Sequence, residues 1–148
     1  MKIDDRVEVL VRSVLDAAVH KDIDRLAAAT ASLGEEATVT KAVELSLAVA
    51  AAVLFEVHEG MPSADQVTEI SRTIAEQERW SGVRAAEVDS LLQAISTGSP
   101  VVAGSGSASA AVPFVVTANL LAAASQPDEG EWWFNYLDKV EAAIEAAG

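Results

Sequence analysis

Acidic residues that lie close together in the sequence are the most numerous groups in this chain that could carry out acid–base chemistry. The pairs are Asp4 with Asp5, Asp22 with Asp24, Glu35 with Glu36, and Glu76 with Glu78. A catalytic acid needs a pKa raised by burial or by a neighbouring like charge. None of these pairs lies in a setting that would raise a pKa. Glu44, at the edge of an apolar run, has Lys41 three residues earlier as a simple ion-pair partner.

The two histidines, His20 and His58, do not indicate a metal site. Neither belongs to an HExxH or a Glu-x-x-His pattern. Glu56 and Glu59 are too close to His58 in sequence to face it on one helix. The chain has no cysteine, which excludes disulfides, thiolate nucleophiles and cysteine-type zinc sites. We therefore predict neither a metal nor a cofactor.

The Gly/Ser-rich segment at 97–108 is the one place where backbone amides could cradle a phosphate. Gly104-Ser105-Gly106-Ser107 precedes a predicted helix, but the chain has no GxxxxGK[ST] motif and no GxSxG nucleophile elbow. No Lys or Arg lies between Arg84 and Lys139 to provide a countercharge. This composition favours a flexible loop over 97–108.

The segment Trp132-Trp133-Phe134-Asn135-Tyr136 holds four of the seven aromatic residues (three Trp, one Tyr and three Phe). Neighbours on a helix are about 100° apart, so one helix cannot turn all of them inward. We expect Trp133 on the buried stripe, Trp132 and Tyr136 together beside it, and Phe134 elsewhere. Either another helix of this chain or a partner protein covers the second face. Trp132, Phe134 and Tyr136 are therefore candidate partner-binding residues.

Trp80 is a fourth candidate for partner binding and lies in the predicted turn Trp80-Ser81-Gly82. A tryptophan and a glycine at this spacing between two helices resemble the turn of the small secreted helical hairpins named for their Trp-x-Gly motif. The resemblance covers these three residues and the hairpin around them. This chain is longer, and Val140 stands four residues after Tyr136 in place of the acid of the associated export signal. The alternative is a structural turn in which Gly82 has a positive φ and Trp80 covers the core.

The net charge of −13, from 10 basic and 23 acidic residues, limits the possible partners. Nucleic-acid binding requires Lys and Arg to neutralise phosphates, so we predict no nucleic-acid partner. The same charge repels anionic lipid surfaces. It would attract a basic protein, and the alternative is that it serves only to keep an alanine-rich chain soluble.

Apolar periodicity predicts an all-α, compact single-domain helical bundle of about seven helices over residues 1–148. Two alanine-rich apolar helices, at 42–57 and 109–125, are expected to be neighbours in the core. Amphipathic helices would surround them, including a hairpin on either side of the turn at 80–82. The uncharged run from Leu45 to Phe55 is shorter than the roughly 20 residues that a bilayer requires. The charged N-terminus does not match a signal peptide, so we expect a cytoplasmic protein.

These observations leave three hypotheses about function. The first is a non-enzymatic interaction protein, such as an adaptor, an accessory subunit or an immunity-type inhibitor. It would bind another protein, possibly basic, or associate with itself through the C-terminal helix. The second is a small-molecule-binding bundle in which the uncharged region 90–127 lines a pocket and Thr117, Asn119 or Ser125 orients the ligand. The third is an enzyme that uses paired carboxylates.

Overall fold

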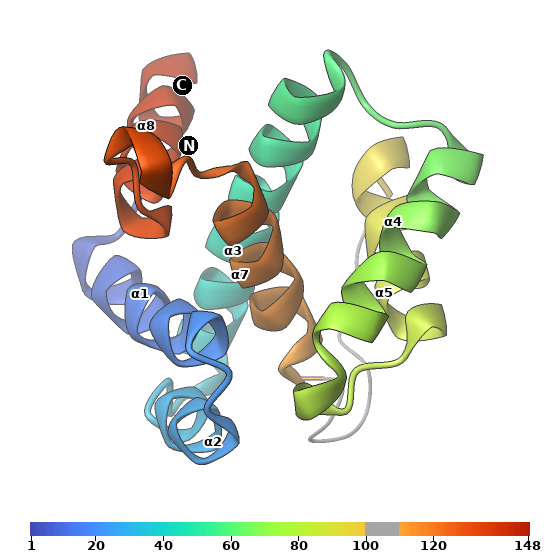
Figure 1. The fold of residues 1–148 in the computed structure, drawn as a ribbon. Helices are drawn as coiled ribbons and strands as arrows, with labels where there is room; N and C mark the ends of the chain where they lie inside the picture. The colour runs from blue at the N-terminus through green and yellow to red at the C-terminus, as the bar shows by residue number, and fades with distance from the viewer. Residues whose placement is uncertain (100–109) are drawn as a thin grey trace.

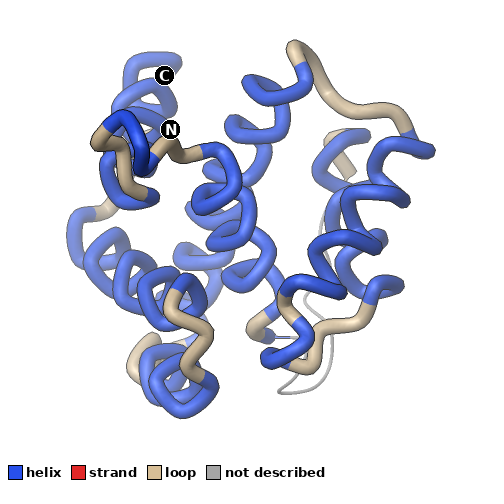
Figure 2. Tube along the Cα trace, in the orientation of Figure 1, coloured by secondary structure: helices blue, strands red, loops and turns tan. Residues whose placement is uncertain are grey.

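The computed structural model describes residues 1–99 and 110–148, and in these two ranges it is all-α (Figures 1 and 2). Seven α-helices lie in the described ranges, joined by short loops and two 3₁₀ turns, as the sequence predicts. They are α1 (Asp5–Val19), α2 (Ile23–Ala31), α3 (Glu36–His58), α4 (Ala64–Gln77), α5 (Ala85–Thr97), α7 (Val112–Ala124) and α8 (Trp133–Ala147). The 3₁₀ turns are η1 (Arg79–Ser81) and η2 (Pro127–Glu129).

Helices α3 and α7 are the central pair of the bundle, which confirms that the two apolar helices are neighbours in the core. Helix α7 packs against α1, α3, α5 and α8, and Figure 1 shows it in the middle of the molecule. Ser46 and Thr117 join the two central helices through a hydrogen bond of 2.8 Å from Ser46 Oγ to Thr117 Oγ1. Thr117 Oγ1 in turn donates to the Pro113 carbonyl oxygen at 2.7 Å. These bonds satisfy both hydroxyls where water cannot reach them.

The helix ends follow from short-range hydrogen bonds that the sequence encodes. Asp4 and Asp22 cap α1 and α2, with side-chain oxygens that accept backbone N–H groups of the first turn. Ser63 and Gln66 form a capping box at the start of α4. Helix α3 ends where Glu59 and Gly60 adopt positive φ values of 54° and 133°.

The outer helices cover the central pair on two sides. Helices α4 and α5 pack against each other as the predicted hairpin, and Figure 1 shows them side by side on the right. Helix α1 packs on α2, α3 and α7, and α8 packs on α3 and α7. Figure 1 shows the start of α8 above α1 on the left of the molecule. This arrangement sets residues near the two ends of the chain beside each other.

Helix α3 is the one described helix that is long and apolar enough to cross a membrane, with a mean hydropathy of 1.7 in its most apolar window. The sequence argument considered only the uncharged run, whereas the helix has 23 residues. A core helix of a soluble protein meets the same criterion. Here the buried side chains of α3 lie along most of its length and pack against α1, α7 and α8.

The predicted flexible loop at 97–108 lies mostly outside the described residues. Thr97 belongs to α5, and Gly98 ends that helix with a φ of 70°. Pro113 lies in the first turn of α7, as expected.

Candidate functional site

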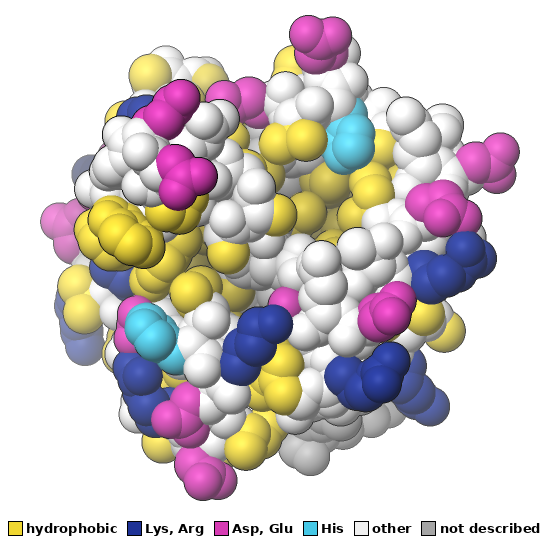
Figure 3. Space-filling model, in the orientation of Figure 1, with side chains coloured by type: hydrophobic (Ala, Val, Ile, Leu, Met, Phe, Trp, Pro, Cys, Tyr) yellow, Lys and Arg dark blue, Asp and Glu magenta, His cyan; other side chains and the backbone are white. Residues whose placement is uncertain are grey.

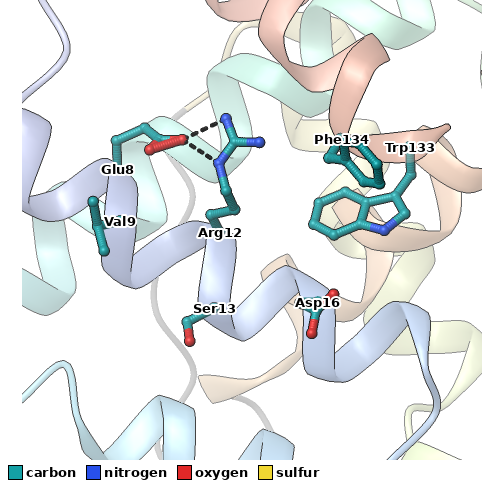
Figure 4. Close-up of a pocket in the computed structure, with 7 residues that line it drawn as sticks. All are labelled: Glu8, Val9, Arg12, Ser13, Asp16, Trp133 and Phe134. Carbon is teal, nitrogen blue, oxygen red and sulfur yellow. Dashed lines mark hydrogen bonds and ion pairs between the residues drawn. The ribbon is translucent and has the colours of Figure 1, made fainter. Parts of the chain in front are cut away.

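A groove of about 510 Å³ lies on the surface between α1 and α8 (Figure 4). Its α1 wall consists of residues that repeat along one helical face, because positions three and four apart are neighbours on a helix. Its α8 wall is the first turn of that helix. The lining residues are Glu8, Val9, Arg12, Ser13, Asp16, Trp133 and Phe134.

Exposed hydrophobic side chains surround this groove. Trp133 packs into the protein at 8% exposure, and its ring meets Phe134 edge to face at a centroid distance of 5.9 Å. Phe134 is 42% exposed, Trp132 is 54% exposed and Val9 is 66% exposed. Figure 3 shows hydrophobic side chains gathered on the surface between the start of α8 and α1, with acidic side chains close by. We define the docking patch as Val9, Trp132 and Phe134.

Tyr136 does not belong to this patch, although the sequence groups it with Trp132. Its ring is buried, and its hydroxyl donates to Glu56 Oε2 of α3 at 2.9 Å. Burial and the Glu56 carboxylate raise the pKa of Tyr136 to about 12. Trp132 precedes the helix in an extended conformation, with φ −87° and ψ 169°, so the helical spacing does not apply to it. Tyr136 therefore joins α8 to α3 inside the protein.

Replacing Tyr136 by phenylalanine should lower the free energy of unfolding by about 1 kcal/mol, because it removes one hydrogen bond to a charged acceptor. Glu56 is exposed, so water can take the place of the lost hydroxyl and keep the cost small. Chemical denaturation at neutral pH measures this change. An equal loss in a variant that also carries Glu56→Gln would confirm that the two side chains act as a pair. Additive losses would contradict the pairing.

Trp80 lies in η1, does not line the groove, and packs within the protein. It is half-buried against the core, and its indole Nε1 donates to Glu78 Oε1 at 2.9 Å. The buried Glu78 carboxylate also accepts from Asn119 Nδ2 of α7 at 2.8 Å. Gly82 has the expected positive φ, at 80°. Trp80 thus helps to fasten the α4–α5 hairpin to α7.

A cluster of four charged side chains joins α1 to α8 beside the groove. Arg12 donates to Glu8 Oε1 through Nε at 2.7 Å, and to Asp138 Oδ1 through a terminal nitrogen at 2.7 Å. The same terminal nitrogen lies 3.2 Å from Glu141 Oε1. We call Glu8, Arg12, Asp138 and Glu141 the Arg12 cluster. Three carboxylates share one guanidinium. Burial lowers the pKa of Arg12, but Glu8 and Asp138 outweigh this effect and raise it.

Glu141 is the residue that the sequence reasoning missed. It is 8% exposed, and its burial beside Glu8 raises the pKa of its carboxyl to about 7. Asp138 contributes to the same rise, and Arg12 opposes it. A signal was present in the sequence, since Glu141 follows the buried Leu137 by four residues and therefore lies on the same helical face.

A raised carboxyl pKa is a common property of catalytic acids, but the surroundings of Glu141 do not support that role. Glu141 does not line the groove, and its carboxyl contacts Arg12 within the Arg12 cluster. Asp16, which does line the groove, pairs with Arg25 at 2.5 Å and lies 3.4 Å from His20 Nδ1. Within residues 1–99 and 110–148, no group of three or more His, Asp or Glu side chains is arranged to hold a metal ion.

The polar residues proposed to orient a small ligand are engaged within the chain. Thr117 bonds to Ser46 and Pro113, and Asn119 donates to Gln77 and Glu78. The Ser125 hydroxyl donates to the Ala122 carbonyl oxygen at 2.9 Å.

Glu44 and the serines of the Gly/Ser-rich segment are the remaining candidate site residues of the sequence. Glu44 is exposed, and Lys41 lies 3.7 Å from Asp4, so the expected pairing of Lys41 with Glu44 is replaced by one with α1's cap. The serines at 105 and 107 lie outside the described residues.

In comparisons with known proteins, no family model, no curated protein and no solved structure matches this chain.

Proposed function

We propose that this chain is a non-enzymatic interaction protein that binds another protein through the docking patch and the groove beside it. The observation that carries the proposal is the exposure of Phe134, which lines the groove, and of Trp132, which directly precedes the lining residue Trp133 in the chain. Tryptophan and other aromatic residues are the usual anchors of protein interfaces, where they contribute more free energy than their number suggests. An adaptor, an accessory subunit or an immunity-type inhibitor would each use such a surface.

The docking patch is large enough to contribute measurably to the affinity of a larger interface. The exposed parts of Trp132 and Phe134 amount to roughly 200 Å² of surface, judged from the usual areas of these side chains. Burying this area would stabilise a complex by up to about 5 kcal/mol. Ordering the partner and losing its free motion would offset part of that gain. Within an interface that other contacts complete, losing the two aromatic side chains should weaken binding at least tenfold, since each 1.4 kcal/mol is about tenfold.

Charge complementarity indicates a partner with a basic surface. The chain has a net charge of −13, and Glu8 and Asp16 line the groove itself. Arg12 is the one cation in the described lining, and its charge is shared among three carboxylates. A partner that places an apolar side chain against Trp132 and Phe134, with Lys or Arg at the rim, would match both features. Such an attraction would speed association and weaken with added salt.

Replacing both Trp132 and Phe134 by alanine should abolish stoichiometric recovery of a partner when the tagged chain is purified from its native cells. The matched control is Phe55→Ala, because Phe55 is 58% exposed but lies on α3 and does not line the groove. The unmodified chain and the control should recover the same protein, with less recovered as salt is raised. Equal recovery by the double variant would contradict the proposed surface.

Sedimentation of the purified chain separates a foreign partner from self-association. A monomer at micromolar concentration is expected, because two copies of a chain with a charge of −13 repel each other. A dimer that the double alanine variant converts to a monomer would show that the patch joins two copies, and would replace the basic partner in the proposal.

A further inference from the structure

The Arg12 cluster bears on how the groove keeps its shape. Glu8 and Arg12 belong both to the cluster and to the groove wall, as Figure 4 shows. Asp138 and Glu141 lie on α8, one and two turns after the groove residues Trp133 and Phe134. Any movement that separates Arg12 from Glu141 therefore changes the spacing between the two walls.

The charge balance of the cluster depends on a single proton. With all three carboxylates ionised, one guanidinium faces three negative charges, and the cluster has a net charge of −2. A proton on Glu141 reduces this to −1 and allows the Glu141 hydroxyl to donate to Glu8, an interaction that favours the protonated form. Burial strengthens both the attraction and the repulsion, because water screens buried charges less well.

We propose that the Arg12 cluster is a proton-sensitive latch between α1 and α8, closed while Glu141 is protonated and loosened when Glu141 ionises. Protonation would thus hold the groove in the geometry described here. Ionisation would leave three like-charged carboxylates, one on α1 and two on α8, around one shared arginine. The predicted effect on docking rests on the function proposed above, whereas the latch itself does not.

The other elements packed against α8 offer no competing charge at this position. Helix α7 carries no titratable side chain between Val112 and Ala124. On α3, Glu56 accepts the Tyr136 hydroxyl, and Lys41 pairs with Asp4. From α1, Glu8 and Arg12 face Glu141, and Asp138 faces it from α8 itself.

The direction of the pH effect follows from where the proton is held more tightly. The carboxyl pKa of Glu141 is about 7 in the closed form, against 4.5 for the free side chain. The closed form therefore binds the proton more tightly, and the latch weakens as the pH rises from 4.5 to about 7. Above that range the weakening is complete. Each pH unit within the range changes the opening equilibrium by about tenfold.

Amide hydrogen exchange on the full chain tests the latch without any partner. Protection of the α8 amides, corrected for the intrinsic exchange rate, should fall by about tenfold per unit between about pH 5 and pH 7 and then level off. Glu141→Gln keeps the neutral shape of the side chain and should remove this fall. Glu145→Gln, which changes an exposed glutamate one turn further along α8, should leave it unchanged. A flat profile in the unmodified chain, or an unaltered one in Glu141→Gln, would overturn the latch.

Two further measurements keep the inference independent of variant folding and of the docking proposal. A carbon NMR titration of the Glu141 carboxyl should show a midpoint near neutrality, and a midpoint near the free value of 4.5 would overturn the inference. Partner recovery should fall between about pH 5 and pH 8 for the unmodified chain but not for Glu141→Gln. The two proposals can fail separately. If amide exchange depends on pH as expected, but the double alanine variant at Trp132 and Phe134 still recovers the partner, the latch stands and the docking surface is wrong.

Discussion

Phe114→Ala should lower the free energy of unfolding by about 3–5 kcal/mol, the cost expected for emptying a fully packed aromatic site. Phe114 is 1% exposed and lies in the first half of α7, the helix that packs against α1, α3, α5 and α8. The lost side chain leaves a cavity that four helices cannot all close. Because small domains are stable by only about 5–15 kcal/mol, a single change of this size removes a large part of the total free energy of unfolding.

Urea denaturation followed by circular dichroism measures this loss. Phe55→Ala provides the control, because Phe55 is 58% exposed and its removal should change stability by no more than about 0.5 kcal/mol. Equal losses in the two variants would mean that α7 is not the packed centre of the bundle. A change in the denaturant slope would instead indicate a less compact native or unfolded state.

Arg12→Met should cost about 2 kcal/mol near pH 8 and clearly less near pH 5, because the arginine is the shared counterion of three carboxylates. This expected cost is below the usual cost of breaking a fully buried ion pair, because the Arg12 side chain is 31% exposed. Without the guanidinium, the carboxyl pKa values rise, so protons neutralise the cluster at acid pH. Stability lost at pH 8 is therefore partly recovered at pH 5.

Thermal or urea unfolding at both pH values tests this prediction. Arg72→Met is a suitable control, because Arg72 pairs with Glu69 on one exposed helix face where such pairs contribute only a few tenths of a kcal/mol. The control should show a small cost that does not depend on pH. A cost for Arg12→Met that is the same at pH 5 and pH 8 would show that packing of the arginine stem, not its charge, supports the cluster.

The sequence predicted most of the architecture because local signals determine most of it. The caps at Asp4, Asp22 and Ser63 and the positive φ at Gly34 and Gly82 are local features that set the helix ends, and the turn at 80–82 lies where it was expected. The apolar character of α3 and α7 likewise indicated a central pair. Each of these features depends on residues only a few positions apart.

The candidate site was harder to predict because a single residue's difference in a helix boundary rearranges its side chains. The expected pairing of Trp132 with Tyr136 assumed that both residues lie in one helix. Helix α8 begins at Trp133, so Trp132 takes an extended conformation and stays exposed while Tyr136 turns inward. Helical periodicity applies only within the helix.

The Arg12 cluster could not be predicted from the sequence because its members are far apart in the chain. Arg12 and Asp138 are separated by 126 positions and meet only when α1 and α8 lie together. The sequence shows each half as an ordinary polar pair on its own helix. Burial of Glu141 and the resulting rise of its pKa depend on that tertiary contact.

The central position of α7 has a consequence for how the chain is made. Translation proceeds from the N-terminus at about 5–20 residues per second, and α7 is completed 66 residues (124 − 58) after α3. The apolar surface of α3 therefore waits for roughly 3–13 s before its core neighbour exists. During that interval the nascent chain exposes the apolar face of α3 that later packs against α7, and we expect ribosome-associated chaperones to bind it there.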